Sequence, residues 1–430
     1  MLTEEPHLDP PSGPVVVDDD KHPPLSPARV LAYCLANIGY GMFFAFNNWI
    51  LTLWLGKYTN DASLIGFLGG SHSYEGVVLQ PLAGSISDRL KSPLGRRRPI
   101  ILATVPVSCL FLCLAPLVGH VHSHRIVWIA AAVVIFTSTF NLAADPYQAL
   151  LADITNPAQR GRVAGFWYLI GSVGQVLVLF LPGALESKFY WVAGIMLVTT
   201  LATVAWTRER PTTTPDTHIR KRDEFRKALS GLRQLKQARY YLLMFLLYGA
   251  GTDAITPNLS RFIKTITHCS DKTALHSLIA LQLFVALSMV PAGWLADRFG
   301  YKRLLFTGFT LVGIASLLGL WVTTLHQIWA VLALAGIALA AQNAGAYPLL
   351  TRLVPSKEIG LYTGLQTAVV SIAGPVAIWF TGQLINHSHG QYRLIFAVCC
   401  VCTLLAAIAL APIKLDRARQ EVADREAAAA

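Results

Sequence analysis

Charged residues are scarce in this chain of 430 residues. Asp, Glu, Lys and Arg together make up 14% of it, whereas soluble globular domains average about 25%. Hydrophobic residues make up 54% of the chain. This low share of charge over so long a chain excludes an ordinary soluble enzyme, and the 10 Trp, 14 Tyr and 19 Phe exclude a disordered chain. We therefore expect a polytopic helical membrane protein.

Cysteine is also sparse. The seven cysteines are odd in number and mostly scattered through apolar stretches, so they predict no disulfide framework. Cys399 and Cys402 form a C-x-x-C pair inside a hydrophobic run, but a zinc site needs further ligands nearby. We interpret these two cysteines as small packing residues.

Enzyme signatures are missing from the sequence. It contains no G-x-x-x-x-G-K-[ST] phosphate loop, no H-E-x-x-H and no G-x-S-x-G. We therefore expect a protein that is not an enzyme and that needs no cofactor or metal. Any energy that it uses must come from an ion gradient or from the gradient of a solute.

Apolar segments recur from one end of the chain to the other. A helix crosses the hydrocarbon of a bilayer in roughly 20 apolar residues. Twelve segments qualify, namely 29–54, 63–87, 99–119, 125–152, 163–184, 189–207, 239–264, 274–296, 303–323, 327–353, 361–385 and 392–412. The expected fold is an all-α membrane protein with twelve transmembrane helices in two six-helix bundles.

The polar segments divide the chain. Residues 1–28 carry Pro, Asp and Glu without an apolar core, which predicts a disordered cytoplasmic tail and no signal peptide. An N-terminal bundle is expected over 29–207 and a C-terminal bundle over 239–413. Between them, 208–238 is a basic linker that can form a helix on the membrane surface. Residues 414–430 form a second cytoplasmic tail.

Basic residues lie mostly on one side of this predicted topology. The net charge is +11, and most of the 35 Lys and Arg fall in the two tails and the even-numbered loops. The positive-inside rule then places both termini in the cytoplasm. The basic run Arg220, Lys221 and Arg222 is therefore a topology signal, and we expect no nucleic-acid partner. The short loops favour a bacterial inner membrane and a monomer in the lipid bilayer.

Two loop motifs occur once in each half of the chain. Gly84-Ser-Ile-Ser-Asp88-Arg89 ends the second predicted span, and Gly293-Trp-Leu-Ala-Asp297-Arg298 ends the eighth. After the fourth and tenth spans, Gly161-Arg-Val-Ala-Gly165 matches Gly360-Leu-Tyr-Thr-Gly364. Because both repeated motifs fall at equivalent spans, they predict duplicated six-helix bundles around a central path.

The first motif also predicts a conformational latch. Gly84 lets another helix approach closely, and Asp88 can pair with the basic residues after it or face a helix N-terminus of the other half. Such a cluster can hold one conformation and release in another, although a simple positive-inside anchor is the alternative. The predicted latch residues are Gly84, Asp88, Arg89, Gly95, Arg96, Arg97, Arg98, Gly293, Asp297, Arg298 and Arg303.

The motif G-x-x-x-D-R, once per half and followed by a glycine and basic residues, resembles the major facilitator superfamily. Six residues separate Asp88 from Gly95 in the first copy, whereas two separate Asp297 from Gly300 in the second. The long first copy is similar to plant sucrose transporters and their animal relatives, in the glycoside–cation symporter group. Further stretches similar to that group are Gln80-Pro81-Leu82, Asn141, Pro146, Ala149–Asp153, Pro348-Leu349 and Gly360–Gly364.

One departure from that group concerns the fourth span. There, the sucrose transporters carry an Asp and, further along, an Arg that are thought to serve the proton and the sugar. The matching positions here are Thr137 and Gln148, which carry no charge. The resemblance thus implies a transporter fold, while the proton site of the group is not carried over.

Ionisable residues inside the predicted spans are the first functional candidates, because a charge in a membrane is costly. Glu75, Asp145 and Asp253 are the carboxylates, and His72 lies three residues before Glu75 on the same helix face. A carboxylate and an imidazole near neutral pH can bind and release a proton. The alternatives are a structural hydrogen bond for His72, backbone groups freed by Pro146 for Asp145, and a pair with Arg261 for Asp253.

Uncharged polar residues line several spans and suit a hydroxyl-rich ligand. Asn141, Asp145 and Gln148 are spaced to share one helix face, with Tyr147 as a neighbour. Each polar residue alone also fits the role of a hydrogen bond between helices. The candidate substrate contacts are Asn47, Asn48, Asn141, Tyr147, Gln148, Tyr168, Gln175, Asn258, Gln282, Gln342, Asn343 and Gln366.

These observations favour a secondary transporter that moves a small polar solute, a sugar or glycoside, by alternating access with proton symport. A uniporter or a proton-coupled exporter of an amphipathic compound is the first alternative, consistent with the missing Asp and Arg pair. A non-transporting membrane sensor is the second.

Overall fold

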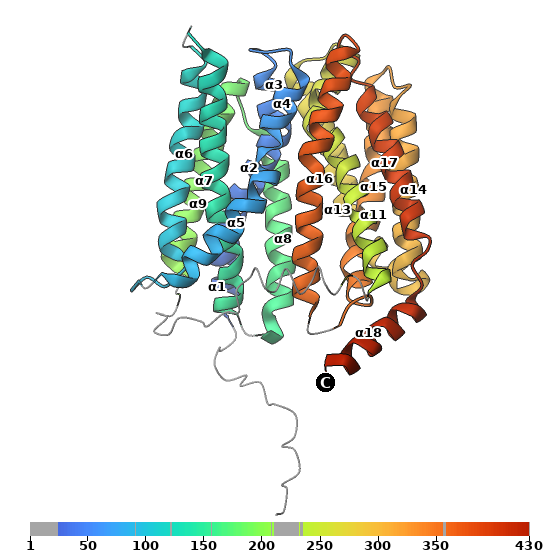
Figure 1. Ribbon diagram of the computed structural model, residues 1–430. Coiled ribbons are helices and arrows are strands. Elements are labelled where there is room, and N and C mark those ends of the chain that lie inside the picture. Colours follow the sequence, from blue (N-terminus) through green and yellow to red (C-terminus); the bar gives the residue numbers. More distant parts are fainter. Residues whose placement is uncertain are drawn as a thin grey trace, which may run out of the picture.

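The structure is a computed structural model that describes residues 25–90, 92–120, 123–155, 157–207, 209, 232, 235–355 and 358–429. All regular elements in these ranges are helices (Figure 1). Most of the predicted linker over 208–238 and the tail before Leu25 lie outside the described residues.

The N-terminal half contains the first six predicted spans. Its elements are α1 (Pro27–Cys34), α2 (Ala36–Ala45), η2 (Phe46–Leu51), α3 (Thr52–Leu55), α4 (Ala62–Gly69), α5 (Ser71–Arg89), α6 (Arg98–Val118), α7 (Arg125–Ile154), α8 (Pro157–Phe180) and α9 (Leu185–Trp206). The first four form one span, with a π-helical segment at η2. The second span is divided into α4 and α5 at Gly70.

The C-terminal half contains the other six spans and one further helix. Its elements are α11 (Lys236–Ile255), η3 (Thr256–Asn258), α12 (Leu259–Thr267), α13 (Asp271–Phe299), α14 (Tyr301–Gly319), α15 (Leu325–Leu350), α16 (Ile359–His387), α17 (Leu394–Leu410) and α18 (Leu415–Ala429). The seventh span is interrupted by the 3-10 segment η3, where Pro257 cannot donate a backbone hydrogen bond. The axis of α18 is turned 67° from that of α17.

Helices of the right length and apolarity confirm the expected fold class. Within the described residues, nine helices are long and apolar enough to cross a membrane, and the bent pair of α17 and α18 brings the number to ten. The predicted second and seventh spans correspond to the two broken helices. The chain is thus an all-α, multi-pass membrane protein.

The two halves repeat the same helix pairings. In the N-terminal half, α2 packs against α8 and α9, α6 against α7 and α9, and α5 against α7. In the C-terminal half, α11 packs against α16 and α17, α14 against α15 and α17, and α13 against α15. Each pairing joins equivalent spans, which confirms the two six-helix bundles that the loop motifs predict.

Both ends of the described chain lie on one face of the molecule. The start of α1 and the whole of α18 are at the bottom in Figure 1. We call this side the terminal face and the other side the opposite face. The loops after α3, α6, α8, α12, α14 and α16 lie at the opposite face.

The halves are joined toward the opposite face. Ser260 Oγ donates to the carbonyl of Trp49 at 2.9 Å, Asn386 Nδ2 donates to Asp61 at 2.8 Å, and Gln282 Nε2 donates to Gln175 Oε1 at 2.8 Å. Between pairs of described residues, every hydrogen bond from one half to the other belongs to this region. The conformation is therefore closed at the opposite face.

Candidate functional site

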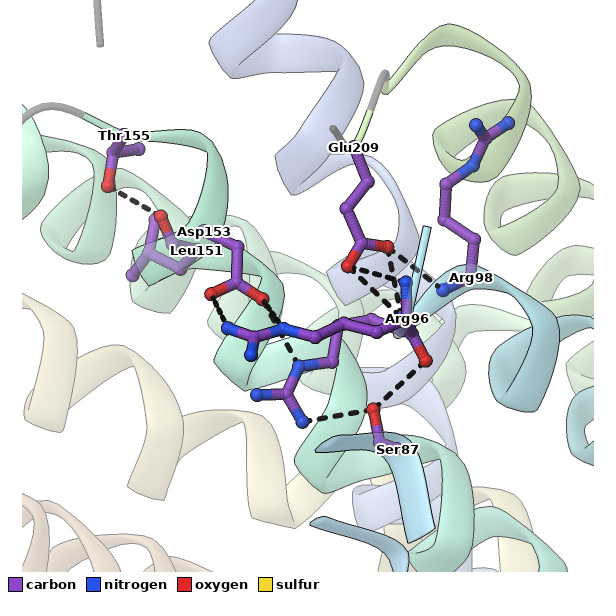
Figure 2. A network of polar contacts seen from close by, with 8 residues as sticks. Ser87, Arg96, Arg98, Leu151, Asp153, Thr155 and Glu209 are labelled. Carbon is purple, nitrogen blue, oxygen red and sulfur yellow. Dashed lines mark hydrogen bonds and ion pairs between the residues drawn. The ribbon is translucent and has the colours of Figure 1, made fainter. Parts of the chain in front are cut away.

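A network of polar contacts surrounds the turn between α5 and α6, at the terminal face (Figure 2). Gly95 has a φ of 94°, and a Cβ at this position would overlap the Glu209 carboxylate. That carboxylate accepts the backbone N–H groups of Arg96, Arg97 and Arg98 at 2.9, 3.0 and 3.3 Å. Glu209 thus compensates the unsatisfied donors at the start of α6.

Asp153, near the end of α7, binds two of these arginines through their side chains. Arg96 donates to both carboxylate oxygens, at 2.7 and 3.2 Å, and Arg97 Nε donates to Oδ2 at 3.2 Å. Arg97 also donates to Ser87 Oγ at 2.9 Å, and Ser87 donates to the carbonyl of Arg96 at 3.1 Å. Side chains of α5 and α7 are thereby joined to the start of α6 (Figure 2).

The predicted latch is only partly represented in this network. Gly84 is buried on α5, and the side chains of Asp88 and Arg89 lie outside the described residues. Arg98 Nη2 donates to the carbonyl of Val204 on α9 at 2.6 Å. Asp153, Glu209 and Ser87 belong to this network but are not among the predicted latch residues. In the sequence, Asp153 and Glu209 could have been identified by their position at the ends of predicted spans, on the side where basic residues gather.

The second copy of the motif has different contacts. Asp297 accepts the Tyr301 hydroxyl at 2.9 Å, and Arg298 lies over the ring of Trp294 on its own helix. Gly293 has open space around its Cα, and Arg303 is exposed. The carboxylate of this copy thus binds the first residue of the next helix, α14, rather than an arginine.

Glu75 and His72, both on α5, contact different helices. Ser138 Oγ of α7 donates to Glu75 Oε2 at 3.0 Å. His72 is buried, and its ring lies edge-on to Phe44 of α2 with centroids 5.1 Å apart. None of the described interactions joins His72 directly to Glu75. The prediction that His72 changes the proton affinity of Glu75 therefore has no direct contact among these interactions behind it.

Asp253, on α11, is packed against α16. A Cβ at Gly374 would overlap Oδ2 of Asp253, so only glycine lets the carboxylate approach this helix. Asp253 is half-buried and makes no hydrogen bond or ion pair with another described residue. Arg261, its suggested partner, stacks instead on the ring of Tyr392, with its guanidinium 5.0 Å from the ring centre.

The polar residues of α7 differ in exposure. Asn141 is buried, Asp145 is half-buried and Gln148 is exposed. The Tyr147 hydroxyl donates to the carbonyl of Tyr33 at 2.8 Å, and the Tyr33 hydroxyl donates back to the carbonyl of Tyr147 at 3.1 Å. Tyr147 thus joins α7 to α1, which is a structural role.

Two asparagines occupy the irregular segments of equivalent spans. Asn47 lies in η2 of the first span and Asn258 in η3 of the seventh, and these segments contact each other. Both side chains are fully buried, and their amide atoms have no hydrogen-bond partner among the described residues. A buried amide without a partner is costly, so these groups are candidates for binding water or a polar ligand.

The remaining candidates fall into three groups. Gln175 and Gln282 bind each other across the halves, and Gln366 accepts the Tyr241 hydroxyl at 2.9 Å within the C-terminal half. Gln342 is buried, and its amide has no partner among the described residues. Asn48 is half-buried, whereas Asn343 and Tyr168 are exposed.

The arrangement defines a class of membrane protein: two related six-helix bundles, joined near one face, with carboxylates and amides inside their spans. The family model of the Major Facilitator Superfamily matches residues 30–281 and 241–429. The chain belongs to the major facilitator superfamily.

Solved structures share the fold at low sequence identity. The nucleoside transporter NupG superposes with a TM-score of 0.72 over 89% of this chain and 99% of its own, at 13% identity. A D-xylose-proton symporter superposes with a TM-score of 0.68 over 90% and 98%, at 17% identity.

Curated relatives are more similar over shorter stretches. Proton-associated sugar transporter A of Homo sapiens is 30% identical over 165 residues, which are 33% of this chain and 22% of the relative. Sucrose transport protein SUC4 of Arabidopsis thaliana is 38% identical over 115 residues, 24% of this chain and 22% of the relative. The matched stretches span about a fifth of each relative. They confirm the predicted likeness to the sucrose-transporter branch.

Proposed function

We propose that this protein is a secondary transporter that moves a small polar solute, a sugar or glycoside, by alternating access with proton symport. The observation that carries the proposal is the pair of half-buried carboxylates, Glu75 and Asp253, inside spans of a superfamily member whose relatives are named as sugar transporters. The proposal also places the terminal face in the cytoplasm, because the basic residues gather there.

Asp253 is the first candidate for the coupling proton. A carboxylate inside a span costs free energy when it is charged and has no partner. Binding a proton removes this cost, so protonation changes the stability of the local structure. Gly374 places this carboxylate against α16, which also contacts α4 and α5 of the other half. Protonation of Asp253 can therefore change the packing of α16 against the N-terminal half.

The solute is proposed to bind beside the irregular segments of the first and seventh spans. Asn47 and Asn258 offer donors and acceptors that no described residue satisfies, and a sugar hydroxyl can pair with both kinds of atom. Because η2 and η3 come from different halves, a solute bound between them contacts both halves, and its binding depends on the distance between the halves.

Uptake into liposomes that contain the purified protein tests the proposal. We expect accumulation of a sugar or glycoside when a pH gradient is imposed, and loss of accumulation in Asp253→Asn and Glu75→Gln. Asp416→Asn on the exposed side of α18 is the matched control and should transport as the unaltered protein does. Equal transport with and without the gradient, together with full activity of both carboxylate variants, would contradict proton symport.

A uniporter or exporter of an amphipathic compound is the second candidate. It is favoured by Thr137, which stands where the sucrose transporters carry an Asp and whose hydroxyl donates to the carbonyl of Val133. For this candidate we expect efflux of an amphipathic dye from loaded liposomes and no accumulation of any sugar.

A further inference from the structure

A cavity lined by lysines and apolar side chains lies between the halves at the opposite face. Its volume is about 550 Å³, within the range of small-molecule sites. The N-terminal half supplies the end of α8, the loop that follows and the start of α9, and the C-terminal half supplies the start of α13. Both halves therefore contribute to one cavity.

The charges around this cavity do not balance. Lys57 is paired with Glu186 at 2.7 Å, and Asp271 is paired with Lys264 at 2.6 Å, so these two pairs cancel. Lys188 and Lys272 also line the cavity and have no carboxylate partner among the described residues. Two positive charges thus face the cavity without compensation, and His276 lies beside them.

Lys188 is the buried member of the two, with 5% of its surface exposed. Its ammonium donates to the carbonyl of Leu181 at 2.5 Å, which leaves two further donors. Lys272 belongs to the other half and lines the same cavity, as His276 does. Buried charges are normally paired, so this arrangement lacks an anion.

We propose that this cavity binds a phosphate-bearing anion between Lys188 and Lys272. The anion comes either from the headgroup of a phospholipid or from free phosphate in solution. Because the two lysines belong to different halves, the bound anion bridges the halves and stabilises the conformation that is closed at the opposite face. This site is independent of the solute and of its coupling to protons.

Thermal unfolding of the full-length protein in detergent tests the site with inorganic phosphate as the probe. Potassium chloride at matched ionic strength is the control for screening. We expect phosphate to raise the unfolding temperature, and Lys272→Gln to weaken the apparent phosphate affinity at least about tenfold. Lys188→Gln should do the same, and Lys272 is exposed, so its variant remains informative if the buried substitution impairs folding.

Two further variants sharpen the test. Lys272→Glu places a carboxylate opposite Lys188, so it should raise the unfolding temperature without phosphate and abolish the response to phosphate. Lys236→Gln removes the same charge from an exposed position at the terminal face and should respond as the unaltered protein does. Equal phosphate responses in all variants, or a response matched by chloride, would overturn the proposal.

The source of the anion is decided in nanodiscs. If phosphatidylglycerol stabilises the protein more than phosphatidylcholine does, and this difference is lost in Lys272→Glu, the anion is a lipid headgroup. Stabilisation by added phosphate in phosphatidylcholine nanodiscs, lost in the same variant, supports a soluble anion. If neither anionic lipid nor phosphate stabilises the protein, the cavity is not an anion site.

Discussion

The turn after α5 and the turn after α13 are copies of one motif that differ in what surrounds them. Gly95 and Gly300 have φ values of 94° and 89°, so both turns place a glycine at a positive φ that other residues rarely adopt. Around Gly95, two acids from other spans bind three arginines. Around Gly300, Tyr301 of the next helix is the one described residue that forms a hydrogen bond with the motif carboxylate Asp297.

The residues that lie opposite each copy of the motif explain this difference. When Gly161 is aligned with Gly360, Asp153 falls opposite Arg352, which stacks on Tyr301 at 4.6 Å from the ring centre. Glu209 follows α9, whereas the basic residue Lys414 follows α17. The C-terminal half thus lacks the acids on which the network of the first half depends.

Helix α18 provides other contacts in the C-terminal half. Arg425 is paired with Glu358, just before α16, at 2.9 Å. Glu421 accepts the backbone N–H of Gln237 in the first turn of α11 at 3.0 Å. The duplicated motif therefore preserves the shape of the turn, and the polar contacts of each half depend on residues outside the motif.

The largest expected effect is that of Gly95→Ala. The left-handed backbone costs about 1–2 kcal/mol for a residue with a Cβ, and displacing Glu209 adds about 1–3 kcal/mol. Gly300→Ala is the matched control, because Gly300 also has a positive φ but open space around it, and should cost only the first amount. Thermal unfolding in detergent measures both, and equal losses would contradict a role for Glu209.

Asp153→Asn is expected to lower the free energy of unfolding by about 2–3 kcal/mol, because it removes the negative charge that pairs with the largely buried Arg96 and Arg97. Denaturant unfolding measures the change. Arg352→Gln, at the equivalent position of the other half, should cost clearly less. A loss from Arg352→Gln as large as that from Asp153→Asn would show that the two turns are equally dependent on these residues.

Arg425→Gln is expected to cost about 1 kcal/mol, because Glu358 is only partly exposed and loses an ionic partner. The effect should appear as earlier proteolysis of α18 and a small fall in unfolding temperature. Arg419→Gln, exposed on the same helix, is the control. Indistinguishable proteolysis of the two variants would mean that the ion pair does not hold α18 in place.

The smallest effect is expected for Asp297→Asn, at most about 0.5 kcal/mol, because its hydrogen bond with Tyr301 is exposed. Thermal unfolding measures the change beside that of Asp153→Asn. A loss of similar size in both would remove the difference between the two turns.

The sequence predicted the spans better than it predicted their interruptions. Apolar length identified each helix because the bilayer requires it, but the π-segment around Asn47 and the break at Gly70 are local backbone changes inside apolar runs. Tyr147 illustrates the same limit for side chains. Its position beside Asp145 suggested a ligand contact, whereas its hydroxyl binds the backbone of α1.

What the sequence by itself determined was the class of fold, the duplication and the superfamily, because these follow from apolar length, charge distribution and motif spacing. Only the tertiary structure decided which groups come together: Glu209 with the N–H groups after Gly95, Asp253 with Gly374, and Lys188 with Lys272 in the lining of one cavity. These partners lie on different spans, and contacts between helices depend on packing geometry that a single chain's pattern does not specify.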